Sequence, residues 1–335
     1  GLSYFSLLQL YASPFADGNG SKLGVPLQLK GNVSSGDNKL ERASVGAVYT
    51  QIVDDLNFAD SNLPATRASA LLNSTRAVKS AAIALKTRVY LHMGRYADVI
   101  AEANKIVSAN APFTSSAGIA HTLAPAVADV FKTPYTHVER IFNFPFTEND
   151  LPGTQNGLGS YYNPGPRGIG DYSMNTNGLM KDTIGWRNND DRRSFIFLVT
   201  TKRYWNKFPA GPQHLDFVPV IRYAEVLLNL AEAKARTAGL DAQALALLNA
   251  VRSRSKGNTY TSFATAADLI EAILLERQIE FLGEGFRGID QQRLLRPLPA
   301  KGSVTAINSN SPAYIWPIPA GELLVNKSCV QNPGY

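Results

Sequence analysis

The sequence is poor in the residues that build disulfides and metal centres. Cys329 is the one cysteine among 335 residues, so an internal disulfide and a thiolate metal cluster are both excluded. The four histidines, His92, His121, His137 and His214, lie far apart and show no metal-ligand spacing. The sequence therefore predicts neither a metal site nor a cofactor.

Charged residues and long apolar runs are also scarce. Charged residues make up 18% of the chain, below the ~25% usual for soluble domains, so the composition excludes intrinsic disorder. Lys and Arg exceed Asp and Glu by 33 to 27, which is far too small an excess to indicate nucleic-acid binding. The longest charge-free stretch, residues 106–128, is interrupted by Ser, Asn, Pro and Gly, which excludes a transmembrane helix there.

The first residues have the apolar character of a buried helix. Residues 1–11 read as an apolar helix without a capping residue or a polar lead-in. A helix this apolar needs partners on most of its surface. We therefore expect that an upstream segment has been lost, together with any targeting signal that it carried.

Apolar residues recur every three or four positions in two separated blocks of the chain. In the first block this spacing predicts helices over residues 45–62, 76–93 and 96–109. In the second block it predicts helices over 222–238 and 242–254, and one from 265 onwards that opens with a Thr265–Asp268 capping box. Gly94 and Gly239 mark tight corners, so each block contains a helical hairpin that resembles a tetratricopeptide repeat.

The residues between the two blocks differ in composition. Gly and Pro supply 16 of the 77 residues in 143–219, against 45 of 335 overall, which predicts loops and short strands. Two strands are predicted, over 141–146 and 195–201. The same 77 residues hold 12 of the 32 aromatic residues, and loops on rigid scaffolds often carry binding residues.

An ordered set of motifs resembles the SusD/RagB family. These motifs are RYAEVLLNLAEA at 222–233, LLNAVR at 247–252, ERQIEF at 276–281, E-G-F-R at 284–287, WPIP at 316–319 and QNPGY at 331–335. The resemblance implies a mainly α fold, in which tetratricopeptide-like helical hairpins form a curved scaffold and a loop-rich insertion carries short strands. We expect a single SusD-like domain, with a helical scaffold at 1–110 and 220–296, an insertion at 111–219 and an irregular C-terminal segment at 297–335.

The resemblance also implies a function. Members of the family are lipoproteins on the outer-membrane surface of Bacteroidetes-type bacteria, where they bind oligosaccharides or other nutrients without catalysis. They deliver these ligands to a TonB-dependent transporter of the SusC type. The expected partners are thus a nutrient ligand and a SusC-like transporter, with no nucleic acid, and membrane attachment only through a lipid anchor on the missing N-terminus.

Candidate ligand residues come from the aromatic loops of the insertion. Sugar rings present apolar C–H faces that stack on aromatic rings, while their hydroxyl groups pair with amides and charged groups. The residues that combine both chemistries are Tyr161, Tyr162, Asn163, Arg167, Tyr172, Trp186 and Asn188. For Trp186 and the tyrosine pair, a ligand platform and loop packing are left as equal alternatives. Packing is favoured for Trp205, and Trp316 is interpreted as structural.

Two other functions are weighed against this one. Glu276 and Glu280 stand four residues apart on one helix face, a spacing that could suit a glycosidase, but structural ion pairing with nearby arginines is favoured. Residues 190–193, with the sequence DDRR, are interpreted as a turn held by charge pairs. The second alternative is a helical protein–protein interaction scaffold that binds no small ligand.

Overall fold

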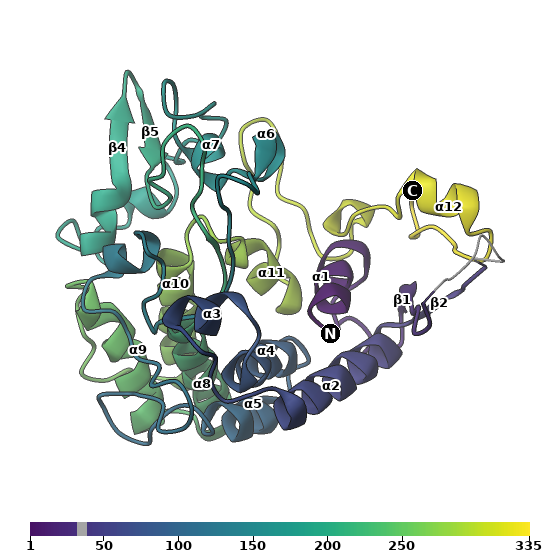
Figure 1. The fold of residues 1–335 in the computed structure, drawn as a ribbon, viewed down its shortest axis with the longest axis horizontal. Coiled ribbons are helices and arrows are strands. Elements are labelled where there is room, and N and C mark those ends of the chain that lie inside the picture. The colour runs from purple at the N-terminus through teal and green to yellow at the C-terminus, as the bar shows by residue number, and fades with distance from the viewer. Residues whose placement is uncertain (32–38) are drawn as a thin grey trace. The chain divides into compact units, whose positions relative to one another are not determined.

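The computed structural model describes residues 1–31 and 39–335, which divide into two compact units. The smaller unit comprises residues 1–59, 89–95 and 285–335, and the larger unit comprises 60–88 and 96–284. Helices are the main elements of both units (Figure 1), which confirms the predicted mainly α fold. The expected division into scaffold, insertion and C-terminal segment stays a prediction.

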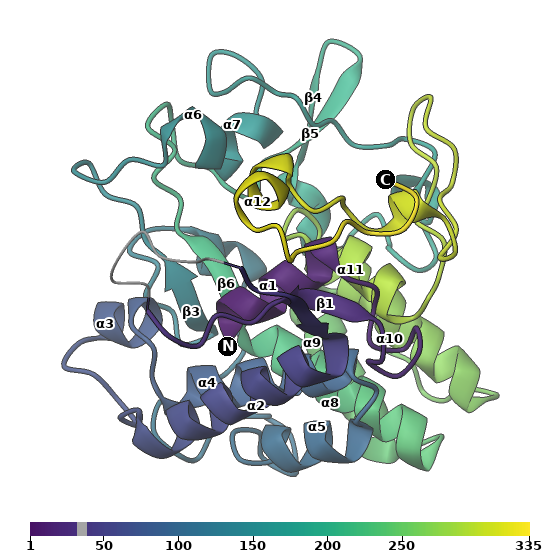
Figure 2. The same ribbon diagram turned by 90° about the vertical axis from the view of Figure 1, so that its right-hand side faces the viewer.

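The helical part of the larger unit is built around one buried helix. That helix is α8 (Tyr223–Ala238), and twelve of its sixteen residues are buried. It packs against α5 (Tyr96–Ala103), α9 (Ala242–Arg254) and α10 (Ala266–Glu280) (Figures 1 and 2). The α8–α9 corner is Gly239, whose φ of 72° is one that residues with a side chain rarely adopt.

Most predicted helices occur close to their expected bounds. α2 (Val45–Asn62) and α9 coincide with the predictions, and the capping box of α10 is present. α4 (Lys79–His92) is shorter than expected. α5 ends at Ala103, because the next residues form the tighter i to i+3 hydrogen bonds of a terminal turn. The helices that the periodicity did not predict are short and include α3 (Ala70–Thr75), α11 (Phe286–Arg293) and α12 (Ala320–Val325).

A two-stranded sheet begins within the segment predicted as an insertion. β3 (Arg140–Phe144) pairs antiparallel with β6 (Val218–Arg222), so that residues 145–217 leave the sheet and return to it. A hairpin of β4 (Ile196–Val199) and β5 (Lys202–Trp205) and the short helices α6 (Gly153–Asn156) and α7 (Leu158–Tyr162) lie between them in the chain. The two predicted strands therefore occur, as β3 and β4, in a segment that is otherwise mostly loop (Figure 1).

Buried ion pairs join the insertion to the helices. Glu280 on α10 accepts hydrogen bonds from Arg222 at 2.8 Å, Arg254 at 2.5 Å and Arg192 at 3.0 Å. Burial disfavours the ionised form of Glu280, but these arginines more than offset it and hold the pKa far below its usual range. The other members of this charge network are Glu139, Asp190, Lys207, Arg252, Glu276 and Glu284.

The charge network accounts for two sequence predictions, the charge-paired turn at 190–193 and the ion pairing of Glu276 and Glu280. Asp190 and Arg192 form the expected charge-paired turn, at 2.7 Å. Lys207 is fully buried, and its ammonium donates to Glu284 at 2.6 Å and to the Glu280 carbonyl at 2.7 Å. Burial lowers the pKa of Lys207 to about 8, although Glu284 and Glu280 favour its charged form. The arginines that pair with Glu276 and Glu280 include Arg192, Arg252 and Arg254. All three lie outside the ERQIEF motif at 276–281 that carries the two acids.

The smaller unit is organised around α1 (Leu2–Tyr11) and the first part of α2. Phe5 of α1 lies 6.3 Å from Tyr49 in an edge-to-face contact, beside the buried Val48 and Ile52. A two-stranded sheet, β1 (Leu23–Pro26) with β2 (Arg42–Ser44), packs on α1. Figure 2 shows α12 next to α1 and β1. Within the described part of the chain, no helix has both the length and the apolar character needed to cross a membrane.

Candidate functional site

Three predicted tyrosines form a row that runs from the surface into the core of the larger unit. Tyr161 and Tyr172 lie 5.7 Å apart, and Tyr172 lies 5.9 Å from Tyr162. Tyr162 stacks in turn on the buried Phe208 at 6.0 Å. The outer end of the row is accessible, because Tyr172 is 58% exposed and Tyr161 is half-buried.

The loop after α7 folds back and places Tyr172 on Tyr161. The Tyr172 amide donates to the Tyr161 carbonyl at 3.1 Å, and the Ile169 and Gly170 amides donate to Ser160. Gly168 is required at this turn, since a Cβ there would lie 2.5 Å from the carbonyl oxygens of Asn163 and Ser160. The Gly- and Pro-rich composition that predicted a loop thus also permits its close return to α7.

A hollow of about 470 Å³ opens beside Tyr161. Its walls are mostly apolar, from the strand end Phe144, from Phe146 and from Leu158 of α7. Val218, which pairs with Phe144 in the sheet, and Asn156 complete it. Phe144 is 48% exposed, and Tyr161 belongs both to the hollow and to the tyrosine row, so the two features adjoin. We call Tyr161, Tyr172, Phe144, Phe146 and Leu158 the aromatic hollow.

The structure corrects the predicted role of Trp186. Its side chain has no exposed surface, so the ring cannot meet a ligand. The Trp186 ring packs edge to face on Trp205, with ring centroids 6.2 Å apart. The Arg193 guanidinium lies over the Trp186 ring, 4.3 Å from its centroid. Of the two readings that the sequence left open, packing therefore applies to Trp186. Trp205 is also buried, as expected.

The polar candidates have three different surroundings. Asn163 is buried, and its amide donates to the carbonyls of Gly159 and Phe208, so it shapes the loop and does not face a ligand. Arg167 is half-buried and donates to the Pro209 carbonyl at 2.7 Å. Asn188 is exposed, but no ring contact or hydrogen bond of the described residues joins it to the tyrosines.

The buried carboxylate of Asp216 lies close to α7. Asp216 is 2% exposed and accepts hydrogen bonds from the Tyr135 hydroxyl at 3.2 Å and the Ala210 amide at 3.0 Å. A Cβ added to Gly159 of α7 would lie 3.1 Å from Asp216 Oδ2. Burial raises the pKa of Asp216 to about 6, against the opposing effects of these hydrogen bonds and of nearby arginines.

Glu276 and Glu280 are unsuited to acid–base catalysis. Both are fully buried, and every carboxylate oxygen accepts a hydrogen bond from an arginine. A general acid or base needs an oxygen within reach of a substrate, and here none is available. Structural ion pairing, which the sequence favoured, is confirmed. Within residues 1–31 and 39–335, no cluster of His, Cys, Asp and Glu has the arrangement of a metal site.

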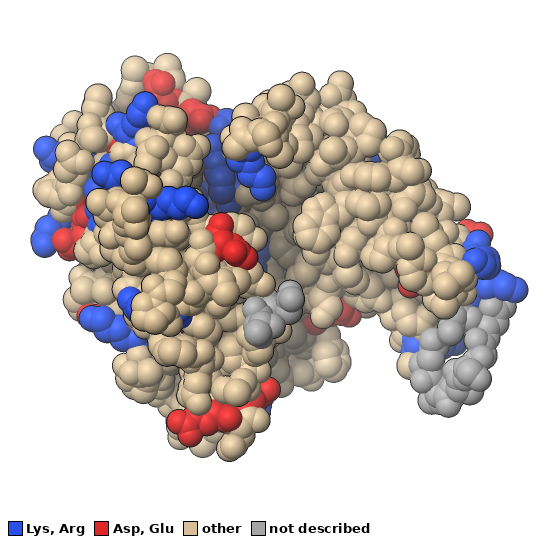
Figure 3. Space-filling model, turned by 90° about the horizontal axis from the view of Figure 1, so that it is seen from above, with Lys and Arg blue, Asp and Glu red and all other residues tan. Residues whose placement is uncertain are grey.

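The basic residues of the insertion do not form one surface. Lys207 and Arg192 are buried in ion pairs, whereas Lys202 and Arg203 are exposed on β5. On the face shown in Figure 3, Lys and Arg and Asp and Glu occur in small separate groups within a mainly uncharged surface. Nucleic-acid binding requires a continuous basic footprint, which this face lacks.

Comparison with known proteins identifies the family. A model of the SusD family matches residues 140–335, and a model described as starch-binding and associating with the outer membrane matches residues 1–91. The chain belongs to the SusD family. The sequence motifs had indicated this family, and the helical fold described above agrees with it.

Solved SusD structures are similar along the whole chain. A SusD superfamily protein from Bacteroides fragilis is 31% identical, with a TM-score of 0.82 over 98% of this chain and 73% of that one. One from Bacteroides thetaiotaomicron has 24% identity and a TM-score of 0.83 over 99% and 75%. A SusD-like carbohydrate binding protein from Bacteroides vulgatus has 20% identity and a TM-score of 0.79 over 97% and 74%. The last two show the fold alone. A comparison with curated proteins finds no match.

Sequence reasoning missed the apolar half of the aromatic hollow. Phe142, Phe144 and Phe146 alternate along the predicted strand, a spacing that places them on one face. That strand belongs to the two-stranded sheet of β3 and β6, which leaves part of this face uncovered, and Phe144 is consequently exposed. The alternation was a usable signal, but the exposure depends on what packs against the strand.

Proposed function

We propose that this SusD-family chain binds oligosaccharides without catalysis and that the aromatic hollow is its ligand site. The observation that carries the proposal is the accessible tyrosine pair, Tyr161 and Tyr172, beside an apolar hollow of about 470 Å³. That volume lies within the ~300–1,000 Å³ typical of small-ligand sites. A sugar ring would stack on the tyrosines and place its hydroxyl groups towards their phenol groups and Asn156.

The mounting of the tyrosines favours binding. Tyr162 is anchored on Phe208, and its hydroxyl donates to the Gly283 carbonyl at 3.4 Å. Tyr161 and Tyr172 are connected by a backbone hydrogen bond. Since the platform is already ordered, a ligand loses little free energy in arranging it. A saccharide nevertheless buries little apolar area and exchanges hydrogen bonds with water, so we expect modest affinity.

The comparisons support the wider role. One similar structure is named as a SusD-like carbohydrate binding protein, and one matching family model is described as starch-binding and associating with the outer membrane. We infer that this chain acts at the surface of the outer membrane and delivers its ligand to a SusC-type TonB-dependent transporter. The arginine-bound state of Glu276 and Glu280 supports a binding protein over a glycosidase.

Calorimetry with a panel of oligosaccharides tests the proposal. A saccharide that binds the wild type should bind Tyr161→Ala and Tyr172→Ala at least about fivefold more weakly, because an interface aromatic often contributes more than ~1 kcal/mol. Trp316→Ala is the matched control, since Trp316 is 57% exposed and lies in the other unit. Equal loss in the control, or unchanged affinity in both tyrosine variants, would exclude the aromatic hollow as the site. Tight binding to a SusC-type subunit with no binding of any saccharide would favour the protein–protein scaffold.

A further inference from the structure

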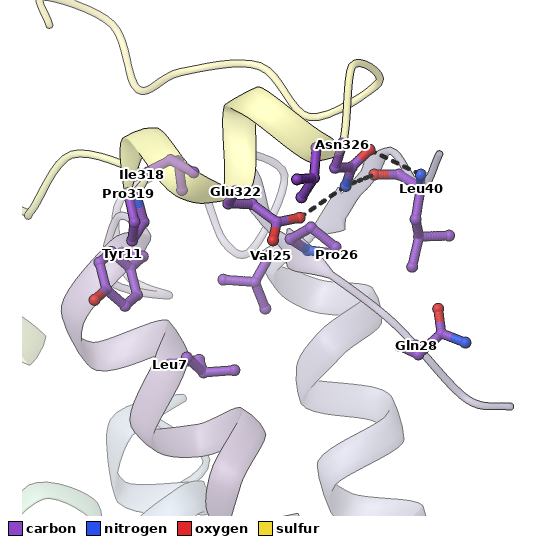
Figure 4. Close-up of a pocket in the computed structure, with 11 residues that line it drawn as sticks. Leu7, Tyr11, Val25, Pro26, Gln28, Leu40, Ile318, Pro319, Glu322 and Asn326 are labelled. Carbon is purple, nitrogen blue, oxygen red and sulfur yellow. Dashed lines mark hydrogen bonds between the residues drawn. The ribbon is translucent and has the colours of Figure 1, made fainter. Parts of the chain in front are cut away.

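The smaller unit contains a pocket of about 480 Å³ that is separate from the aromatic hollow (Figure 4). Three elements supply its walls: α1, β1 and the chain around α12. Most of the lining is hydrocarbon, from Leu7, Tyr11, Val25, Ile318, Pro319 and Val325. Its size and its mainly apolar walls are those of a small-molecule site, in which a few polar groups orient the ligand.

One acidic group is fixed at this apolar surface. Among the described residues that line the pocket, Glu322 is the one with a charge. The Asn326 amide donates to Glu322 Oε1 at 2.8 Å, and Figure 4 shows the carboxylate beside Val25 and Pro26. The other oxygen of the carboxylate, Oε2, has no hydrogen bond from the described residues, and no described Lys, Arg or His is paired with Glu322.

The support for Glu322 is itself rigid. Asn326 is 3% exposed, and its amide also donates to the Leu40 carbonyl at 2.8 Å. Its side-chain oxygen accepts the Leu40 amide at 3.0 Å. Asn326 is therefore held by the backbone and offers the pocket no polar group of its own, while it holds one oxygen of Glu322 and leaves the other available.

We propose that this pocket binds a primary amine carried on a hydrocarbon body. The ammonium group would donate to Glu322 Oε2, and the hydrocarbon would lie against Leu7, Val25 and Ile318. A charge-assisted hydrogen bond is stronger than one between neutral groups, and the apolar surroundings strengthen it further. A saccharide fits this lining poorly, because its hydroxyl groups would meet aliphatic walls without partners. The inference stands independently of the proposed saccharide site.

The experiment uses hexylamine with two matched probes, hexan-1-ol and propylamine, at neutral pH. Each probe is titrated into the 335-residue protein, and binding is measured by the NMR chemical-shift changes of residues that line the pocket. We expect hexylamine to bind about tenfold more tightly than hexan-1-ol, since only the amine pairs with the carboxylate. It should also bind at least about tenfold more tightly than propylamine, because each additional buried methylene group favours transfer from water.

Two variants separate the two contributions. Glu322→Gln keeps an oxygen for Asn326 and should remove the preference for amine over alcohol. Leu7→Ser should weaken hexylamine and reduce the effect of chain length. Glu41→Gln is the control for net charge, because Glu41 is exposed and does not line the pocket, and it should bind as the wild type does.

Three results would overturn the proposal. One is equal binding of hexylamine and hexan-1-ol, and another is the absence of any shift at millimolar amine. The third is self-association of the chain through this surface, measured by sedimentation velocity, that saturating hexylamine does not reverse. In that case a second copy of the chain is the occupant. None of these results affects oligosaccharide binding at the aromatic hollow, so the two proposals fail separately.

Discussion

Residues 143–219 of the larger unit contain two groups of aromatic side chains with opposite surroundings. Trp186 and Trp205 are sealed in a core cluster with Phe195 and Phe208. In contrast, Tyr172 is 58% exposed where it meets Tyr161. The two groups are connected, because Tyr162 stacks on Phe208 and contacts Tyr172. Aromatic enrichment therefore located the segment in which binding is proposed, but it did not separate the rings that hold the fold from those that remain available.

The difference arises from the neighbours of each ring. Arg193 lies over the Trp186 ring and donates to the Trp186 carbonyl, and the Trp205 indole donates to the Leu282 carbonyl at 3.1 Å. These partners surround the tryptophans on several sides. Tyr172 follows a Gly- and Pro-containing loop, and its ring contacts those of Tyr161 and Tyr162. A ring in a turn next to several arginines is thus a poorer candidate for ligand contact than one in a glycine-rich loop.

Trp186→Ala should have the largest effect on stability. Removing a fully buried indole leaves a cavity, so the free energy of unfolding should fall by about 3–5 kcal/mol. Chemical denaturation measures this, with Tyr172→Ala as the exposed counterpart, for which we expect a loss below ~1 kcal/mol. Equal losses for the two variants would show that the two aromatic groups are not distinguished by burial.

Glu280→Gln tests the buried charge network around α10. The substitution leaves Arg222, Arg254 and Arg192 short of negative charge in a buried setting, and we expect a loss of about 3 kcal/mol. The matched control is Glu271→Gln, at an exposed position of the same helix, which should change stability by less than ~0.5 kcal/mol. If both variants unfold at the same denaturant concentration, the network does not stabilise the fold.

Ligand affinity should depend on the exposed tyrosines more than on Trp186, which is the reverse of the order expected for stability. Under conditions in which every variant remains folded, Tyr161→Ala should weaken oligosaccharide binding by ~1–2 kcal/mol. Trp186→Phe, which keeps an aromatic ring in the core, should leave affinity within about a factor of two, because Trp186 has no exposed surface. Calorimetric titration measures both, and a greater loss for Trp186→Phe would contradict the proposed site.

A further prediction concerns the pH dependence of stability that Asp216 contributes. Its pKa of about 6 in the folded protein exceeds its ordinary value of 3.8, so the folded state holds the proton more tightly. This contribution to stability is fully present below pH 3.8 and is lost as the pH rises through 6. The wild type should therefore gain stability relative to Asp216→Asn as the pH is lowered from 7 to 4. Urea titrations at intervals across this range test the sign, and a difference that stays constant would refute the raised pKa.

Local signals predicted the helices well and the site only in part. α2 and α9 follow from periodicity, and the Thr265–Asp268 cap is a local interaction that the sequence displays directly. The aromatic hollow depends on long-range contacts. Phe144 meets Val218 across 74 residues of sequence, and the arginine partners of Glu276 come from separate motifs, so neither arrangement is visible in a short window.

The central claim is that the tyrosine pair, and not the buried tryptophans, contacts the saccharide. NMR spectra with ¹³C-labelled tyrosine rings and ¹⁵N-labelled indoles, recorded during titration with an oligosaccharide that binds, measure this directly. The ring signals of Tyr161 and Tyr172 should shift with the same saturation as the calorimetric binding, while the indole signals of Trp186 and Trp205 stay in place. Saturable binding that leaves both tyrosine ring signals unchanged would contradict the account.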